Sequence, residues 1–184
     1  MRVVAHKPAM AALASGRQQF MDLSGNGEID LVDFSGPAPG FHERDRDDGW
    51  KRHVPFASLP NIDWQDPNLR FVDLTGDGHA DALITEQDVF TWYPSLEERG
   101  FAAAERTHHS RDEGAGPRLV FNDGTQTIFI ADMCGDGLTD LVRIRNGEVC
   151  YWPNLGYGRF GRKVTLANSP MVLTPMWCKY TRFR

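Results

Sequence analysis

Short apolar runs, each bounded by glycine, proline or acidic residues, dominate the hydrophobic pattern of the chain. The runs are three or four residues long and rich in Phe, Ile, Leu and Val, which favours β-strands over helices. Three of them lead into acidic loops and three lead out, at residues 19–21, 69–72 and 128–131 and at residues 31–34, 82–85 and 141–144, respectively. Only residues 8–15 have weak helical character. The pattern therefore predicts an all-β chain.

One nine-residue pattern, Asp-x-x-Gly-[Asn/Asp]-Gly-x-x-Asp, occurs three times without gaps. The copies are residues 22–30, 73–81 and 132–140, and their starts lie 51 and 59 residues apart. Similarity continues downstream, where Val89-Phe-Thr-Trp-Tyr-Pro-Ser-Leu96 resembles Val149-Cys-Tyr-Trp-Pro-Asn-Leu155. Because two separated matches occur in the same order, we interpret them as an internal repeat.

Two dipeptides predict hairpins between the strands. Asn146-Gly147 separates residues 141–144 from 148–152, and Asp123-Gly124 separates residues 118–122 from 125–131; both dipeptides are favoured in two-residue β-turns. About four short strands then fit each period, as in the blade of a β-propeller. A sandwich also contains many short strands, but it does not repeat one loop at every blade length. We therefore predict an all-β partial propeller of about three four-stranded blades with Asp/Gly loops.

Three blades fall short of a closed propeller, which has roughly four to eight. Both outer sheet edges would stay exposed, so we expect the chain to be part of a larger propeller or a truncated gene product. The expected organisation is an N-terminal extension at residues 1–16, a propeller segment at residues 17–170 and an irregular basic tail at residues 171–184.

Composition and charge exclude several classes of protein. Of the 184 residues, 41% are hydrophobic and 24% charged, which is ordinary for a globular chain. No stretch approaches 18 apolar residues, so no membrane insertion is expected. Residues 1–140 carry 12 Lys and Arg against 24 Asp and Glu, whereas residues 141–184 carry 8 against 1. The acidic body argues against nucleic acid as a partner, and we interpret the basic end as a solvated face or an edge.

The cysteines and the first residues bear on the compartment of synthesis. Cys134, Cys150 and Cys178 are odd in number and lack CxxC spacing, so no disulfide framework is expected and a thiol-reducing site of synthesis is favoured. Lys7 and Pro8 interrupt the chain where a signal peptide needs an apolar run. We therefore expect synthesis in the cytoplasm without a conventional signal peptide.

The repeated loop places oxygen donors at its positions 1, 3, 5 and 9 around a glycine at position 6, an alternation that calcium loops use. The candidate ligands are Asp22, Ser24, Asn26 and Asp30 in the first loop, Asp73, Thr75, Asp77 and Asp81 in the second, and Asp132, Asp136 and Asp140 in the third. The second loop is the best candidate, because the third has Cys134 at position 3, a soft ligand poorly matched to Ca²⁺. The same residues also suit metal-free Asx turns. Both interpretations stay open, and in either the loop holds strands in register.

Few residues point to catalysis. His108-His109, followed by Asp112 and Glu113, is the one candidate cluster for an enzyme, and a solvated polar loop explains it better. Neither a nucleophile elbow, a zinc-protease motif nor a phosphate-binding glycine loop is present in the sequence. Trp64, Trp92 and Trp152 fall at related places in the repeats, where packing between blades is the expected role and ligand stacking the alternative.

The loops resemble FG-GAP-type propeller repeats, the class that includes integrin α-subunit blades. A more specific similarity lies in residues 61–78, 88–95, 116–120 and 143–161, the last of which contains Trp-Pro-Asn-Leu-Gly-Tyr-Gly-Arg-Phe-Gly. These segments resemble the middle/N-terminal region of the insecticidal toxin-complex B component (TcB or TcdB type), which is related to the Salmonella virulence-plasmid protein SpvB. The resemblance covers roughly residues 17 to 170.

This resemblance implies a structural part and not an enzyme. In that family, the B component and a C-type toxin subunit form a hollow shell around a toxic polypeptide, and a propeller docks the shell onto an A-type channel subunit and gates it. The implied partners are these two subunits and the remaining propeller blades, and the implied location is extracellular, within a secreted toxin complex. The alternative, from a different class, is a calcium-dependent integrin-like adhesion module with Ca²⁺ as its cofactor.

Overall fold

Three four-stranded antiparallel sheets and one two-stranded sheet make up the computed structural model, which describes residues 7–45 and 49–167. The first sheet contains β1 (Gln18–Met21), β2 (Asp30–Asp33), β3 (Gly40–His42) and β6 (Val54–Pro55). The second contains β7 (Leu69–Val72), β8 (Asp81–Thr85), β9 (Val89–Tyr93) and β10 (Glu105–His108). The third contains β11 (Thr127–Ala131), β12 (Asp140–Arg145), β13 (Glu148–Trp152) and β14 (Val164–Thr165). A small hairpin joins β4 (Arg44–Asp45) to β5 (Gly49–Trp50), and the two short 3-10 helices are η1 (Leu13–Ser15) and η2 (Glu97–Arg99).

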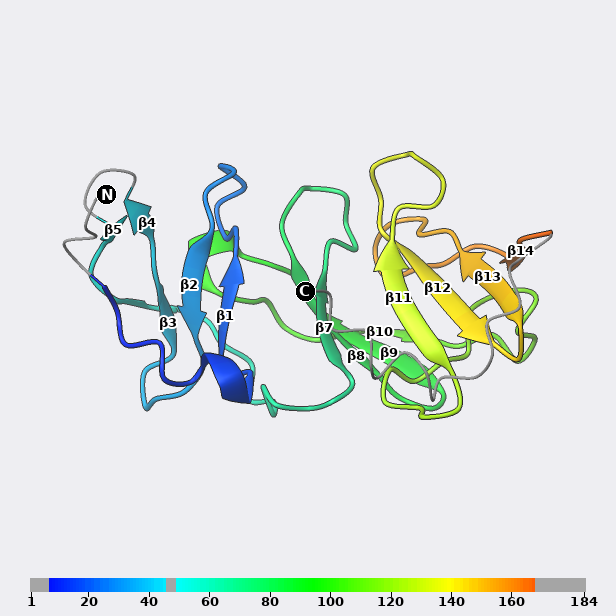
Figure 1. Cartoon of the computed structure of the whole chain (residues 1–184), viewed down its shortest axis with the longest axis horizontal. Helices are drawn as coiled ribbons and strands as arrows, with labels where there is room; N and C mark the ends of the chain where they lie inside the picture. Colours follow the sequence, from blue (N-terminus) through cyan, green and yellow to red (C-terminus); the bar gives the residue numbers. More distant parts are fainter. Residues whose placement is uncertain (1–6, 46–48, 168–184) are drawn as a thin grey trace, which may run out of the picture.

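The three large sheets lie in a row in chain order, and the loops from β1 to β2, from β7 to β8 and from β11 to β12 rise from the same side of the row (Figure 1). The register is the same in each: Met21 pairs with Asp30, Val72 with Asp81 and Ala131 with Asp140. The last residue of each nine-residue pattern thus opens the second strand opposite the residue that precedes the pattern. The all-β class and the four-stranded repeat are confirmed, although three sheets in a row do not form a closed propeller.

Two hydrophobic cores lie between the sheets, one at each interface. The core between the first and second sheets includes Val32, Phe34, Phe41, Ala82 and Phe101. The core between the second and third sheets includes Leu74, Leu83, Trp92, Leu141 and Trp152. Each inner sheet face therefore buries apolar side chains against its neighbour, which is the dominant stabilising contribution in such a stack.

The three related tryptophans pack as expected. Trp92 and Trp152 are 1% and 0% exposed in the core between the second and third sheets. Trp64 stacks on Phe34 with ring centroids 4.2 Å apart, against the core between the first and second sheets. Packing between sheets thus accounts for all three indole rings.

One of the two predicted hairpins is confirmed. Asn146 and Gly147, with φ of 51° and 78°, join β12 to β13 as the paired positive φ values of a type I′ turn require. Asp123-Gly124 instead turns within the connection from β10 to β11, and β11 pairs with β12. The hairpin predicted there is wrong because residues 118–122 are held against the second sheet.

Three contacts hold that connection in place. The Phe121 amide donates to Thr85 Oγ1 and the Asn122 amide donates to Asn68 Oδ1, each at 2.9 Å. Leu119, 2% exposed, inserts into the core between the second and third sheets. The backbone is therefore committed to the second sheet and is not available to pair with β11.

Both ends of the chain extend past the described residues. Within the predicted extension, the Gln18 side-chain amide donates to the Ala9 carbonyl at 2.9 Å and so ties residues 9–12 to β1.

The predicted basic tail at residues 171–184 and Cys178 lie outside the described residues. Of the cysteines inside them, Cys134 is exposed and Cys150 is buried, both as free thiols. In the described part of the chain, no helix has the length and apolarity needed to cross a bilayer.

Candidate functional site

The first aspartate of each loop folds the loop around its own carboxylate. Asp73 Oδ1 accepts hydrogen bonds from the Thr75 and Gly76 amides, and its Oδ2 accepts one from the Gly78 amide at 2.8 Å. Asp22 accepts from the amides of residues 26 and 27, and Asp132 from those of residues 135 and 137. These amide donors hold the pKa of the Asp132 carboxyl below its usual value.

The fifth residue adds a tighter turn inside each loop. The side-chain oxygen of Asn26, Asp77 or Asp136 accepts a hydrogen bond from the amide two residues later, at 2.7 to 2.9 Å. This is an Asx turn, and it fixes the backbone at the seventh residue of the loop. The Asx turn predicted from the sequence is therefore present in all three loops.

The ninth residue is a buried acid that closes each sheet. Asp81, 0% exposed, accepts from the Leu74 amide at 2.9 Å through one oxygen and from the Ser95 amide at 2.7 Å through the other. Asp140 does the same with the amides of Met133 and Asn154. Asp30 accepts from the Arg44 amide at 2.9 Å. Asp81 and Asp140 thus connect the start of their loops to the segment that follows the third strand, whereas the Asp30 carboxylate is held by that segment.

Burial has an electrostatic consequence for these acids. Removal from water disfavours the charged carboxylate and raises the pKa of Asp81 to about 6, although its two amide donors act in the opposite direction. Burial likewise raises the pKa of Asp30. Asp30 and Asp81 therefore act as acceptors of backbone amides and carry a desolvation cost for doing so.

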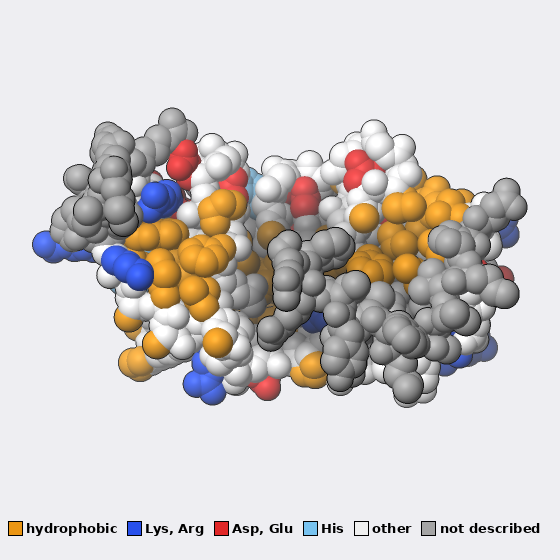
Figure 2. All heavy atoms as spheres, in the orientation of Figure 1, with side chains coloured by type: hydrophobic (Ala, Val, Ile, Leu, Met, Phe, Trp, Pro, Cys, Tyr) orange, Lys and Arg blue, Asp and Glu red, His pale blue; other side chains and the backbone are white. Residues whose placement is uncertain are grey.

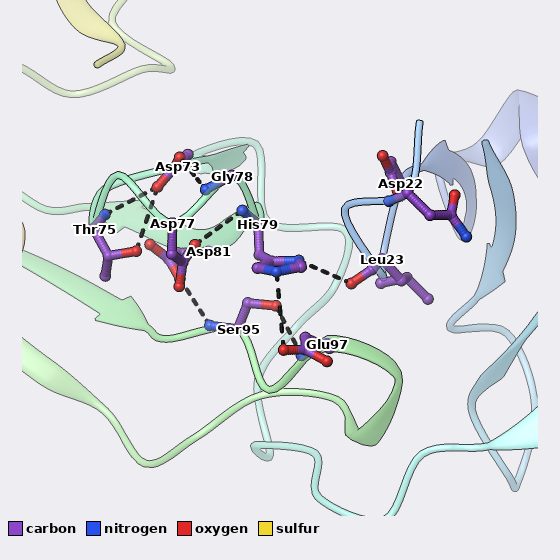
Figure 3. A network of polar contacts seen from close by, with 11 residues as sticks. Asp22, Leu23, Asp73, Thr75, Asp77, Gly78, His79, Asp81, Ser95 and Glu97 are labelled. Carbon is purple, nitrogen blue, oxygen red and sulfur yellow. Dashed lines mark hydrogen bonds and ion pairs between the residues drawn. The ribbon is translucent and has the colours of Figure 1, made fainter. Parts of the chain in front are cut away.

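A histidine from the second loop joins the first and second sheets (Figure 3). His79 Nδ1 donates to the Leu23 carbonyl at 3.1 Å, and His79 Nε2 lies 3.9 Å from Glu97 Oε1. The ring occupies the space beside Gly25, because a Cβ at Gly25 would lie 2.8 Å from His79 Cε1. The seventh residue of one loop therefore rests on the fourth residue, a glycine, of the preceding loop.

The same contact recurs between the second and third sheets. Leu138 is the seventh residue of the third loop, and a Cβ at Gly76 would lie 2.8 Å from its Cδ2. The Leu74 carbonyl, equivalent to that of Leu23, accepts from the Tyr157 amide at 2.6 Å. Asn154 Nδ2 adds a 3.3 Å hydrogen bond to the Asp73 carbonyl. The loops thus form a repeated contact between neighbouring sheets, which we call the loop latch. In it, the seventh side chain of one loop packs on the glycine at position 4 of the preceding loop, and the backbone carbonyl at position 2 of that preceding loop accepts a hydrogen bond from the following sheet.

The predicted calcium ligands are used in a different way. The carboxylates of positions 1 and 9 accept backbone amides, and Thr75 Oγ1 lies 3.4 Å from Asp73 Oδ1. Within the described ranges, no group of three or more His, Cys, Asp or Glu side chains is arranged to hold a metal ion. Calcium ligation by these loops stays a prediction, and the geometry gives the same side chains a role in fixing the backbone.

The two histidines of the candidate enzyme cluster lie at one cavity, but its two acids have other partners. His108, the last residue of β10, is exposed, whereas His109 is half-buried with its ring 4.2 Å from that of Phe90. Burial lowers the pKa of His109. Both histidines border a cavity of about 340 Å³ between the second and third sheets. The acids named with them are engaged elsewhere, because Asp112 accepts from the Gly114 amide and Glu113 forms an ion pair with Arg143.

Sequence reasoning found the loops but missed the loop latch. Its two partners are 54 residues apart for Gly25 and His79, and the seventh residue differs in every copy: Glu28, His79 and Leu138. The available signal was the invariance of the glycine at position 4, which a tight turn explains equally well. Only the placement of neighbouring sheets distinguishes the two roles.

The fold of this chain is similar to parts of several solved structures. A chain of the Photorhabdus luminescens Tc holotoxin pore structure, with a TccC3 mutation, matches 89% of this chain at 27% identity and a TM-score of 0.74. An Agrocybe aegerita lectin that recognises terminal N-acetylglucosamine matches 80% at 18% identity and a TM-score of 0.56. A TcdB2-TccC3 structure matches 80% at 17% identity and a TM-score of 0.54.

The matched chains are much longer than this one. The chain spans 7% of the holotoxin chain, 37% of the lectin and 6% of the TcdB2-TccC3 chain. Neither the protein-family models nor the curated proteins that were searched contain a match. The lectin and TcdB2-TccC3 similarities concern the fold alone. In the holotoxin match, more than a quarter of the matched residues are also identical.

Proposed function

We propose that the chain is a non-enzymatic structural segment of a bacterial toxin-complex B component. The observation that carries the proposal is the likeness to a Photorhabdus luminescens Tc holotoxin chain over 89% of this chain, at a TM-score of 0.74 and 27% identity. The sequence resemblance at residues 61–78 and 143–161 supports the same proposal. A structural role also agrees with the loop carboxylates, which bind backbone amides.

We propose further that the three sheets are blades of a propeller that docks the toxin-enclosing shell onto an A-type channel subunit and gates it. The support is the regular succession of the sheets, each joined to the next by the same loop latch. The proposed partners are the channel subunit, a C-type toxin subunit and the remaining blades, and the proposed location is a secreted, extracellular complex.

A chimera tests the proposal. Residues 17–167 would replace the matched segment of the Photorhabdus luminescens Tc chain, and assembly with the other holotoxin components would be followed by size-exclusion chromatography and electron microscopy. We expect complete particles. A matched control with Asp30, Asp81 and Asp140 all replaced by Ala should not assemble, because each change leaves buried amides without an acceptor. A folded, soluble chimera that never enters particles would refute the proposal.

A further inference from the structure

The interface between the first and second sheets is closed beside the edge strand β6 by the chain itself. After β6, residues 56–58 run alongside residues 99–101, and the two segments are hydrogen-bonded. The Ser58 amide donates to the Arg99 carbonyl at 2.9 Å, and the Phe101 amide donates to the Ser58 carbonyl at 3.0 Å. The contact leaves no space, because a Cβ at Gly100 would overlap the Ser58 carbonyl oxygen.

The equivalent place between the second and third sheets is open. The register of β10 against β9 is that of β6 against β3, which makes residues 109–111 the counterparts of residues 56–58. The isolated bridge that closes the next loop is also in the same place, which makes residues 158–160 the counterparts of residues 99–101. Among the described residues, no hydrogen bond joins these two segments. The cavity of about 340 Å³ lies between them instead, and both segments line it.

Backbone contacts around this cavity hold its walls in place. Gly158 lets the loop after β13 lie against the second sheet, because a Cβ there would be 2.6 Å from Trp92 Nε1 and 3.2 Å from Thr107 Oγ1. The Leu155 amide donates to the Arg159 carbonyl at 2.8 Å and fixes the turn that carries Arg159. The cavity is therefore preformed, which lowers the cost of binding a ligand.

The second sheet contributes a histidine to this cavity where the first interface has a phenylalanine. Phe56 packs on Phe41 with ring centroids 5.8 Å apart. Its counterpart His109 packs on Phe90 at 4.2 Å. Neither buried ring nitrogen of His109 has a hydrogen-bond partner among the described residues, and the nearby Gln87 carbonyl favours the charged ring without meeting that geometry. Phenylalanine would serve packing better, since an unpartnered buried polar group costs stability. The polar character of this place therefore points to a role other than packing.

The charged side chains around the cavity are mostly basic, although the body of the chain is acidic. Figure 2 shows acidic side chains on the Asp-Gly loops. By contrast, Arg159 lines the cavity, and a larger cavity of about 640 Å³ along residues 108–110 is bordered by Arg111, Arg118 and Asp88. Asp88 Oδ1 lies 3.4 Å from Arg118 Nη2, whereas Arg111 and Arg159 have no acidic partner within the described ranges. The local charge therefore favours an anionic ligand.

We propose that this cavity binds a small organic carboxylate that carries an apolar ring. The ring would lie against Phe90 and Phe160, and the carboxylate would accept from the Arg159 guanidinium, a donor whose geometry suits carboxylates. The Phe160 amide would add a second donor, because its counterpart Phe101 donates to the Ser58 carbonyl. The ligand thus supplies the acceptor that the chain itself supplies at the first interface. The inference rests on a comparison of the two interfaces and not on the toxin assignment.

Titration of the full chain with 2-naphthoate tests the proposal. Binding is followed by ¹H–¹³C spectra of the histidine rings, with the His109 signal assigned from its loss in His109→Gln. We expect a shift of the His109 signal and a Kd of about 1 mM, which is ordinary for a ligand of this size. The neutral 2-naphthamide has the same rings without the charge, and acetate has the charge without the rings. Each should bind at least about tenfold more weakly than 2-naphthoate.

Two arginine variants separate the cavity from general surface charge. Arg159→Gln should weaken 2-naphthoate binding at least about tenfold, because the paired charge is lost. Arg106→Gln is the matched control and should bind as wild type does, because Arg106 is exposed on β10 and lines neither cavity. Both side chains are exposed, so both variants should fold, which circular dichroism verifies.

Three results would overturn the proposal. The first is a His109 signal that does not move at about 10 mM 2-naphthoate, tenfold above the expected Kd. The second is binding of 2-naphthamide as tight as that of 2-naphthoate, and the third is equal weakening in the two arginine variants. Selective loss in Arg159→Gln, with 2-naphthoate preferred over both control compounds, supports it. A failed chimera would remove the toxin assignment and leave this result unaffected.

Discussion

Replacing the buried Asp81 by Asn should change how the stability of the protein depends on pH. In the folded chain the pKa of Asp81 is raised to about 6 by burial, from 3.8 for an exposed aspartate. The folded state therefore binds the proton more tightly than the unfolded state does. Below pH 3.8 the carboxyl is neutral in both states, and no cost of a buried charge arises. As the pH rises towards 6 and above, the folded state must hold a carboxylate that the unfolded state would hydrate, so Asp81 lowers stability in this range.

The size of the effect follows from the two pKa values. At about 1.4 kcal/mol for each pH unit between them, the cost above about pH 6 is about 3 kcal/mol. The amide side chain of Asp81→Asn would carry no charge at any pH, but its nitrogen cannot accept from the Leu74 or Ser95 amide, which costs about 1–3 kcal/mol at every pH. The stability of wild type minus that of Asp81→Asn should therefore be larger at about pH 3 than at about pH 7, by about 3 kcal/mol.

Urea denaturation of both proteins at closely spaced pH values from about 3 to about 7.5 measures this difference. Asp123→Asn is an informative comparison, because hydrogen bonds from Thr125 lower the pKa of Asp123, and its effect should run in the opposite direction. There the stabilisation is present above the unfolded pKa and is lost as the pH falls. A wild-type minus Asp81→Asn difference that stays constant with pH would show that the carboxylate is not desolvated as described.

Three other changes test the loops and the core. Gly25→Ala should lower the free energy of unfolding by about 1 kcal/mol more than Gly27→Ala, because it displaces His79 and its hydrogen bond; urea titration of both would measure the gap, and equal losses would contradict the latch. Trp152→Ala should cost about 3–5 kcal/mol by the same assay, since the ring is fully buried. Calcium ligation by the second loop predicts heat on titration and a higher melting temperature, both lost in Asp73→Asn; calorimetry without heat would rule it out.

Much of the sheet pattern could be predicted from sequence because local signals coincide there. The Asp-Gly loops and the flanking apolar runs located β1, β7, β8 and the corresponding strands of the third sheet to within a residue or two. The hairpin β4–β5 and the edge strand β6 have only two residues per strand and no alternation of apolar and polar residues, so the sequence does not predict them. The Asp123-Gly124 hairpin failed because Thr85 and Asn68, distant in sequence, hold the preceding residues.

The site was predicted in its residues and only partly in its chemistry. Oxygen donors at alternating positions suit either a cation or backbone amides, and local sequence does not separate the two. The amides that Asp81 accepts from lie 7 and 14 residues away, on either side of it in the chain. Recognising the ninth aspartate as a closure required the position of Ser95, which is fixed by the β8–β9 hairpin and not by the loop itself.

The ninth aspartate connects segments of a single repeat, since Asp81 and Asp140 accept hydrogen bonds only from amides of their own repeat. The connections between sheets, from β6 to β7 and from β10 to β11, carry none of this function and differ in length. Gene duplication or recombination could therefore add or delete whole units of about 51 to 59 residues and leave the aspartate contacts within each remaining unit intact. The repertoire of such proteins would then grow by copying intact modules, with later substitutions at the seventh residue setting which modules can sit side by side.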